Sequence, residues 1–331
     1  MIKKAVFALT IILAVLSIHA CDDEGSGGAE RVDLRCGDVV TASWVRSDAS
    51  NSRKIVATDD VVNCSGTAVT LEGPETLDLN GHTISCDGSA GTVGIHVTGI
   101  GATVKNGTVQ NCEAGVLAEG DGMHTIKNLE AIENFGEKDI VLSGGFVVLS
   151  GNNTLRNVKA NGNHPVGIQL VGDGNVVTNS EVSENDHMGI VLFGNSNEVS
   201  ETQANNNNYV NIAIVNVINN ELVDAGKNNI ISNVTANHNN LSHGIYIGAN
   251  FNSVSGSEAS NNEISGIRVD STDNNIISNT ALGNNKSVES GFNRGGTDLA
   301  DIADTGVNNL EDCANTWQGN DFNTSDSLCI Q

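Results

Sequence analysis

The feature that most constrains this chain is a short repeat in which a small residue precedes alternating aliphatic side chains. It occurs at Gly94-Ile95-His96-Val97, Gly115-Val116-Leu117-Ala118, Gly167-Ile168-Gln169-Leu170, Gly189-Ile190-Val191-Leu192, Asn211-Ile212-Ala213-Ile214, Gly244-Ile245-Tyr246-Ile247 and Gly266-Ile267-Arg268-Val269, and Asp139-Ile140-Val141-Leu142 fits with aspartate in the first place. The step from Gly167 to Gly189 is 22 residues. An apolar spacing of two indicates strands, and excludes a helical repeat.

Two further short strands are expected in each repeat. Segments such as Asn175-Val-Val-Thr-Asn179 and Asn197-Glu-Val-Ser-Glu201 lie between the first strands, and a third short stretch around Val182 or Ala204 follows each of them. Three strands in 22 residues, with no room for a helix, are typical of stacked coils. The sequence therefore predicts an all-β protein that is a single right-handed parallel β-helix of about ten coils with capped ends.

Alternation places one aliphatic side chain of each first strand inside the rod, so that successive coils build a ladder. Its expected members are Ile95, Val116, Ile140, Ile168, Ile190, Ile212, Ile245 and Ile267. Aromatic residues make up 3% of the chain, so branched aliphatic side chains must form the core. Asparagine and glycine at the corners accept left-handed backbone conformations, and stacked asparagine amides can bond one coil to the next.

The N-terminus predicts export. Lys3 and Lys4 precede an apolar run from Ala5 to Leu16, which is too short to span a bilayer and fits a signal peptide over residues 1–20. The segment Ser17-Ile18-His19-Ala20-Cys21 resembles the lipobox of bacterial lipoproteins, with His19 as a departure. The resemblance implies a lipid on Cys21, a flexible tether over residues 21–29, and a lipid-anchored extracytoplasmic protein of the cell envelope. Ordinary cleavage after Ala20 is the alternative.

The cysteine count agrees with a lipobox. The chain has 7 cysteines, and lipidating Cys21 leaves an even number for disulfides. The spacing suggests three local pairs, which are Cys36 with Cys64, Cys86 with Cys112, and Cys313 with Cys329. Residues 30–70, with Trp44, and residues 300–331 break the repeat, and we expect them to cap a β-helix over residues 71–299.

Charge limits the range of partners. The formal net charge of −24 repels nucleic acid and gives no long-range attraction for polyanionic glycans. Solubility in salty or calcium-rich surroundings explains the charge more simply. No cofactor is predicted from the residues, and Ca²⁺ is the one ion left open.

The repeats resemble the right-handed β-helix superfamily that includes pectate lyases, polygalacturonases, alginate epimerases and the periplasmic β-helix proteins of copper-enzyme maturation. Leu77-Asp78-Leu79-Asn80-Gly81-His82-Thr83-Ile84 is similar to the opening coil of uncharacterised secreted members, and Asn315 to Ile330 is similar to their usual ending. The resemblance implies the fold over residues 33–331. It does not imply one activity, because fold and chemistry separate easily.

No complete catalytic motif of these enzymes is found. Elimination needs a base beside a neutralised substrate carboxylate, yet the basic residues beyond residue 160 do not cluster: Lys227, Arg268, Lys286 and Arg294. Hydrolysis needs several aspartates on neighbouring coils, and that set is missing. Asp186-His187 is only faintly similar to the Asp-Pro-His signature of alginate epimerases.

Two polar groups remain as candidate sites. The corner before the Gly189 strand brings together the candidate catalytic residues His164, Asp186, His187 and Tyr209, with His243 one coil further; the alternative is an ordinary solvated corner. The outward side chains of the first strands supply the candidate substrate-binding residues Gln169, Tyr246, Arg268 and Asp270.

Between these outward polar residues the face is apolar. An exposed stripe is expected of Leu117, Val141, Val171, Val191, Phe193, Ala213 and Val215. Such a stripe marks a contact surface if it is open, but the insertion at residues 216–227 follows directly after Val215, and covering of the stripe by this insertion is the favoured alternative. The sequence favours a non-catalytic lipoprotein that binds a polysaccharide or a surface protein along one face of the rod. The alternative is a polysaccharide lyase, C5-epimerase or hydrolase with a divergent active site.

Overall fold

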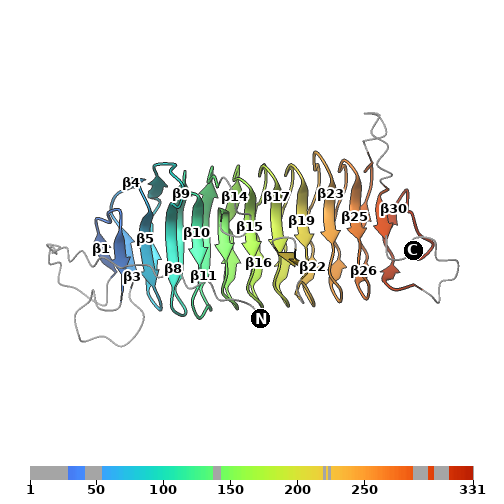
Figure 1. The fold of residues 1–331 in the computed structure, drawn as a ribbon, viewed down its shortest axis with the longest axis horizontal. Coiled ribbons are helices and arrows are strands. Elements are labelled where there is room, and N and C mark those ends of the chain that lie inside the picture. The colour runs from blue at the N-terminus through green and yellow to red at the C-terminus, as the bar shows by residue number, and fades with distance from the viewer. Residues whose placement is uncertain are drawn as a thin grey trace.

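The computed structural model describes residues 29–41, 54–136, 143–218, 221–222, 225–285, 297–301 and 313–330. The predicted signal peptide, Cys21 and most of the tether lie outside these residues, as does Trp44. Every regular element in the described ranges is a β-strand, and the strands stack into an elongated rod (Figure 1). Within these ranges no helix is long and apolar enough to cross a membrane.

Two parallel sheets run along the rod. Sheet 1 has 11 strands in the order β2 (Asp38–Val40), β5 (Thr67–Glu72), β8 (Val93–Thr98), β10 (Ala114–Ala118), β12 (Gly144–Val148), β15 (Val166–Leu170), β17 (Met188–Leu192), β19 (Val210–Ile214), β23 (His243–Ile247), β25 (Ser265–Val269) and β28 (Leu299–Asp301). Each strand of sheet 1 thus comes from a different coil, which is the parallel β-helix that the repeat predicts.

Sheet 2 contains the second strands of the coils. Its path is β1 (Glu30–Val32), β3 (Lys54–Ala57), β6 (Thr76–Asp78), β9 (Thr103–Gln110), β11 (Thr125–Ile132), β13 (Thr154–Arg156), β16 (Val176–Thr178), β18 (Glu198–Ser200), β22 (Ile230–Ser232), β24 (Ser253–Ser255), β26 (Asn275–Ile277) and β29 (Thr316–Gln318). Off this path lie β4 (Val61–Cys64), β7 (Thr83–Cys86) and β14 (Lys159–Asn161). A separate pair is β27 (Thr280–Ala281) with β30 (Asp321–Phe322).

The third stretch of each coil forms short paired strands in the N-terminal coils, from β4 to β14, and single parallel bridges in the coils that follow. The bridges continue from Lys159 through Glu181, Gln203, Thr235 and Glu258 to Thr280. Three faces per coil are therefore present, as the sequence predicts.

The aliphatic ladder of sheet 1 is confirmed for seven of its eight expected members. Ile168, Ile190 and Ile212 pair in register, and each is fully buried. Ile140 was the wrong residue for its rung, because Phe146 of β12 pairs with both Val116 and Ile168. The strand that occupies this rung, β12, begins at Gly144, and the expected strand at 139–142 falls on residues outside the described ranges.

Asparagine ladders join the coils at the corners. Asn185 accepts a hydrogen bond from the backbone N–H of Asn163 at 2.9 Å, and its own Nδ2 donates to Asn207 at 2.9 Å. A second ladder runs from Asn153 through Asn175 towards Asn315. These amides are buried, so their oxygens pair backbone N–H groups that no water reaches, although Nδ2 of Asn197 and of Asn229 has no hydrogen-bond partner in the described structure.

The ladder also explains why glycine opens most of the repeats. A Cβ atom at Gly167 would lie 2.7 Å from Nδ2 of Asn185 and 2.8 Å from the carbonyl oxygen of Gly189. A side chain there would push the corner away from the next coil. The glycine therefore allows the close approach of coil to coil.

All three predicted disulfides are present. They are Cys36–Cys64, Cys86–Cys112 and Cys313–Cys329, and the Cα atoms of the middle pair are 4.9 Å apart, one strand spacing. Three disulfides indicate an oxidising compartment, so the protein folds outside the cytoplasm. The described parts of the predicted caps add strands to both sheets, because β1 pairs with β3 and β28 pairs with β25. The coils therefore begin before residue 71 and continue beyond residue 299.

Candidate binding cleft on sheet 1

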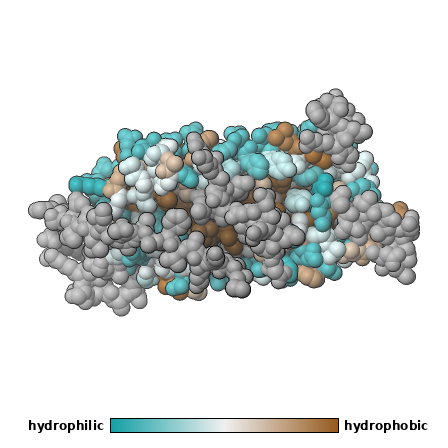
Figure 2. Space-filling view, viewed as in Figure 1, coloured by the Kyte–Doolittle hydropathy of each residue, from teal (hydrophilic) through white to brown (hydrophobic). Residues whose placement is uncertain are grey.

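The outward face of sheet 1 changes character along the rod. One row of outward side chains runs in register through Gln169, Val191, Ala213, Tyr246 and Arg268. The row is apolar in the middle and polar towards the C-terminal coils. Hydrophobic side chains also gather over the middle of the rod in Figure 2, between hydrophilic margins.

The expectation of an exposed apolar stripe is wrong for its central residues. Val191, Phe193 and Ala213 are at most 6% exposed, and with Val166 and Val210 they form a second buried cluster outside the coil interior. Val171 and Val215 are half-buried at its edge. Leu117 is also half-buried, and Val141 lies outside the described residues. This part of the face is a small second core and does not offer an open contact surface.

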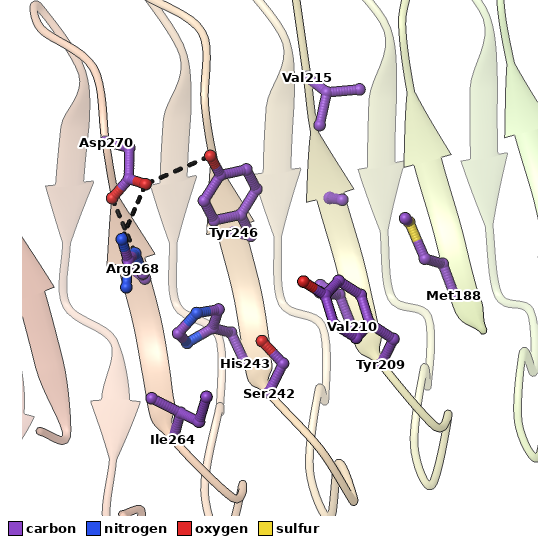
Figure 3. Close-up of a pocket in the computed structure, with 11 residues that line it drawn as sticks. Met188, Tyr209, Val210, Val215, Ser242, His243, Tyr246, Ile264, Arg268 and Asp270 are labelled. Carbon is purple, nitrogen blue, oxygen red and sulfur yellow. Dashed lines mark hydrogen bonds and ion pairs between the residues drawn. The ribbon is translucent and has the colours of Figure 1, made fainter. Parts of the chain in front are cut away.

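An open cleft of about 540 Å³ begins where this cluster ends (Figure 3). It crosses the strands β17, β19, β23 and β25, so neighbouring coils each contribute side chains. Its lining consists of Met188, Tyr209, Val210, Ala213, Val215, Ser242, His243, Tyr246, Ile264, Arg268 and Asp270. Three of the four predicted substrate-binding residues, Tyr246, Arg268 and Asp270, therefore share one cleft.

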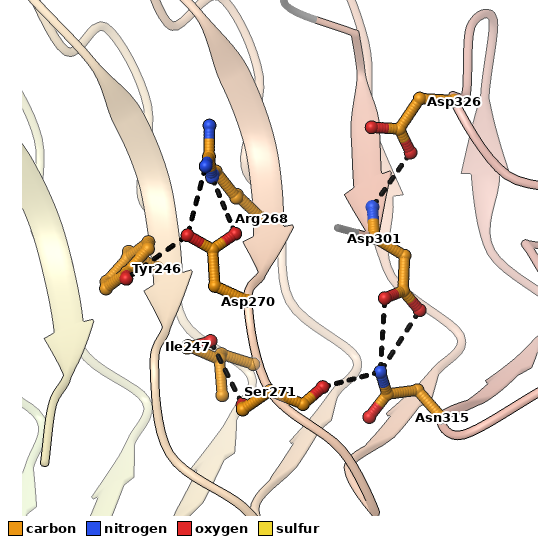
Figure 4. A network of polar contacts seen from close by, with 8 residues as sticks. All are labelled: Tyr246, Ile247, Arg268, Asp270, Ser271, Asp301, Asn315 and Asp326. Carbon is orange, nitrogen blue, oxygen red and sulfur yellow. Dashed lines mark hydrogen bonds and ion pairs between the residues drawn. The ribbon is translucent and has the colours of Figure 1, made fainter. Parts of the chain in front are cut away.

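Arg268, Asp270 and Tyr246 form a polar network at one end of the cleft (Figure 4). Nε of Arg268 donates to one carboxylate oxygen of Asp270 at 2.8 Å, and its Nη2 donates to the other at 3.0 Å. The Tyr246 hydroxyl donates to Asp270 at 3.3 Å. Burial and the Asp270 charge raise the pKa of Tyr246 to about 12, so the phenol stays protonated.

His243 is the buried base of the cleft. It is 6% exposed, and its Nδ1 has no hydrogen-bond partner in the described structure. Burial, aided by the positive charge of Arg268, lowers its pKa to about 4, so the ring is neutral at pH 7. The His243 and Tyr246 rings lie 6.1 Å apart between centroids at 20°.

The four candidate catalytic residues predicted at the corner before the Gly189 strand form two contacting pairs. Nδ1 of His164 lies 2.6 Å from a carboxylate oxygen of Asp186, and the His164 ring stacks on Phe135 with centroids 4.6 Å apart. His187 and Tyr209 stack in parallel at 4.9 Å. Burial lowers the pKa of His187. The four predicted residues thus line one corner on successive coils, and Tyr209 belongs to both this corner and the cleft.

Gln169 does not reach the cleft. It is fully buried on β15, where its Nε2 donates to the backbone oxygen of Ser143. Its outward direction was predicted correctly, but it packs at the far side of the buried cluster. Conversely, the sequence did not single out Met188, Ser242 or Ile264 as lining residues. Because Val210 pairs with His243, Tyr209 and Ser242 stand at equivalent places, but the 33-residue step across the insertion hides this from a search at a period of 22.

No metal centre is assigned. Among the residues that the structure describes, no group of three or more histidine, cysteine, aspartate or glutamate side chains could hold an ion. Asp270, the carboxylate of the cleft, is already engaged by Arg268 and Tyr246. These residues therefore do not form a calcium site as they stand.

The chain shares its fold with known proteins. A family model described as "Right handed beta helix region" matches residues 93–224. No match to a curated protein sequence was found.

Three solved structures illustrate the shared fold. The mannuronan C-5 epimerase AlgE6 A-module of Azotobacter vinelandii has a TM-score of 0.57 and 16% identity, over 81% of this chain and 77% of that one. The AlgE4 A-module of the same organism has a TM-score of 0.55 and 15% identity, over 92% and 83%. The Dettilon tailspike protein has a TM-score of 0.60 and 14% identity, over 84% of this chain and 62% of the tailspike chain. At such identities the likeness shows the right-handed parallel β-helix fold alone.

Proposed function

We propose that this right-handed parallel β-helix protein binds a glycan chain in the cleft on sheet 1 and does not cleave it. The observation that carries the proposal is the open cleft in which the Tyr246 ring lies beside the bidentate Arg268–Asp270 pair. An aromatic ring offers a stacking surface for the apolar face of a sugar. A guanidinium and a carboxylate held in fixed positions offer a donor and an acceptor for its hydroxyls.

The neighbouring corner lengthens the binding surface. Tyr209 is 42% exposed and stacks on His187, one coil towards the N-terminus. His164 and Asp186 continue the same corner. An extended chain that runs along the rod would meet one group per coil, at a spacing of about 4.8 Å. The fold supports this arrangement, since two of the structures that share it are modules of mannuronan C-5 epimerases, which act on a polysaccharide.

The lining of the cleft favours binding over cleavage. Glycoside hydrolysis uses two carboxylates across the scissile bond, and Asp270 is the one carboxylate that lines the described cleft. Elimination or epimerisation of a uronate needs a cation on the substrate carboxylate. Arg268 is held by Asp270 instead. Neither reaction therefore finds its full set of groups.

One observation favours catalysis as the second candidate. His243 is neutral, its Nδ1 is without a partner, and the protonated Tyr246 lies beside it. A neutral imidazole and a phenol can serve as a base and an acid. A lyase, C5-epimerase or hydrolase with a divergent site would use this pair.

The experiment measures binding of the protein to a panel of neutral and acidic polysaccharides by affinity electrophoresis. The same mixtures are then checked for shortened, unsaturated or epimerised products by mass spectrometry and NMR. Binding without new products is expected. New products that disappear in His243→Ala would replace the proposal by the catalytic alternative.

Variants locate the site. Tyr246→Ala and Arg268→Ala should each weaken binding by about tenfold or more, the usual loss for removing a central aromatic or arginine contact. The matched control is Arg156→Ala, which removes an exposed arginine from β13 on sheet 2. His187→Ala tests the corner. Wild-type binding by Tyr246→Ala and His187→Ala, at wild-type melting temperature, would exclude this surface. Failure of the intact protein to bind any glycan would leave a protein as the partner.

We further propose that a lipid on Cys21 holds the protein at the membrane, on the strength of the lipobox alone. The tether that follows would let the rod lie away from the bilayer.

A further inference from the structure

We infer that the cleft selects neutral sugars and excludes polyuronates, because the only guanidinium among its described lining residues is already neutralised by a carboxylate of the same strand end. The inference rests on the proposed function and names the substrate class of the same cleft. The fold does not decide the class, since the epimerase modules that share it act on mannuronan, a polyuronate. The side chains on the outward face of sheet 1 determine which class of sugar the cleft binds.

Arg268 is the single lysine or arginine in the described strands of sheet 1. The eleven strands carry no other such residue, and β23 and β25 contribute only His243 and Arg268 as basic groups to the cleft. His243 is neutral at pH 7. Any anionic sugar in the cleft would therefore depend on Arg268 for a counter-charge.

Arg268 is not free to provide it. Two of its nitrogens bond the two oxygens of Asp270, in the geometry that an incoming carboxylate would need. The pair is held in place, since the Tyr246 hydroxyl donates to the same carboxylate and the side chains of Arg268 and Asp270 are 30% and 24% exposed. A uronate would have to displace Asp270 and leave that carboxylate without its partner, which is unfavourable.

A second carboxylate adds to the repulsion. Asp326 acts on Arg268 through its charge and raises the pKa of the guanidinium together with Asp270. It accepts a hydrogen bond from the backbone N–H of Asp301 on the next coil (Figure 4). Asp326 does not line the cleft and acts on Arg268 only through its charge, as a smaller addition to the Asp270 hydrogen bonds, and the whole chain carries a net charge of −24. Approach of a polyanion is opposed at long range and in the cleft.

A neutral sugar meets no such conflict. Its hydroxyls can donate to the remaining lone pairs of Asp270 and accept from the remaining N–H groups of Arg268, because a hydroxyl is both donor and acceptor. The apolar part of the lining, from Val210, Ala213 and Ile264, suits the C–H face of the ring. The cleft therefore suits a ligand that has polar hydroxyl groups and no net charge.

The experiment compares oligosaccharides of equal length that differ only at C6. Mannose, glucose and galactose oligomers are each paired with the corresponding uronate oligomer, and binding is measured by isothermal titration calorimetry in low salt. Wild-type protein should bind at least one neutral oligomer about tenfold more tightly than its uronate partner. Asp270→Asn frees the guanidinium, so it should bind the uronate at least as tightly as the neutral oligomer.

The double variant Arg268→Gln with Asp270→Asn is the matched control, since it removes both charges and keeps the volume of the side chains. It should not gain uronate binding. Wild-type protein that prefers a uronate, or Asp270→Asn that stays folded and gains no uronate binding, would overturn the inference while leaving glycan binding intact. Absence of binding to every oligomer, together with the polysaccharide panel, would instead overturn the proposed function.

Discussion

The asparagine ladder allows a stability prediction that can be worked out bond by bond. Asn185→Ala removes an amide that is 1% exposed. Its Oδ1 accepts from the backbone N–H of Asn163 at 2.9 Å, and its Nδ2 donates to the backbone oxygen of Ala160 at 2.8 Å. Both backbone groups lose these partners in the variant. The side-chain Nδ2 of Asn163 still donates to the backbone oxygen of Ala131, and the backbone N–H of residue 185 still donates to Oδ1 of Asn207.

Two buried backbone groups are therefore left unpaired. An unpaired buried donor or acceptor costs about 1–3 kcal/mol, so the loss of both partners should lower the free energy of unfolding by about 2–6 kcal/mol. Urea unfolding followed by circular dichroism measures this change. The control is Asn208→Ala, because Asn208 is half-exposed and its side chain makes no hydrogen bond in the described structure. Equal unfolding curves for the two variants would refute the view that the ladder stabilises the stack.

Three other predictions concern the core, the cleft and the anchor. Ile190→Asp should prevent folding, because it places an unpaired charge in a fully buried column, whereas Arg156→Ala on the exposed side of β13 should leave soluble yield and circular dichroism unchanged. The pKa of His243 is about 4 in the folded protein, against an ordinary value of 6.5, so the unfolded chain binds more protons between these values. The free energy of unfolding should therefore fall as the pH drops from 6.5 to 4, by up to about 3 kcal/mol. His243→Gln should make the melting temperature depend less on pH in this window, and the same pH dependence as in the wild type would contradict a buried neutral ring. Cys21→Ser should move the protein from the membrane fraction to the soluble fraction of cells, and unchanged partitioning would remove the lipid anchor.

The repeat is sufficient to predict the fold, because every coil must bury the same face against the next one. A period of 22 residues with an apolar spacing of two leaves no other arrangement for Ile168, Ile190 and Ile212 than a column. The corner asparagines follow from the same period, since equivalent positions of successive coils stack, whereas the disulfides join cysteines 28, 26 and 16 residues apart and depend on local departures from it. Local pattern and global fold agree in these places.

The prediction failed where a coil departs from the period. Ile140 fits the pattern, but Phe146, six residues further on, occupies the rung, because its strand β12 begins at Gly144 and not at residue 139. The pattern of one segment cannot say which of two apolar stretches pairs with the neighbours. Only the register with β10 and β15 decides it.

Strand alternation likewise predicts the direction of a side chain but not its exposure. Val191 points outward as expected, yet it is 1% exposed, because Phe193 and Val210 pack around it on the outside of the sheet. The same limit applies to the cleft. Tyr246, Arg268 and Asp270 could be placed on one face from the repeat, because the strands share a register.

The pairing of Arg268 with Asp270 and the burial of His243 could not be predicted in that way. They depend on side-chain rotamers and on how closely neighbouring coils pack, which no periodicity encodes. Sequence periodicity therefore determines the rod, its core column and the face on which polar groups converge. The charge that this face presents to a ligand is set by side-chain contacts in the folded protein, since a guanidinium bonded to the carboxylate two residues on and a free guanidinium have the same sequence.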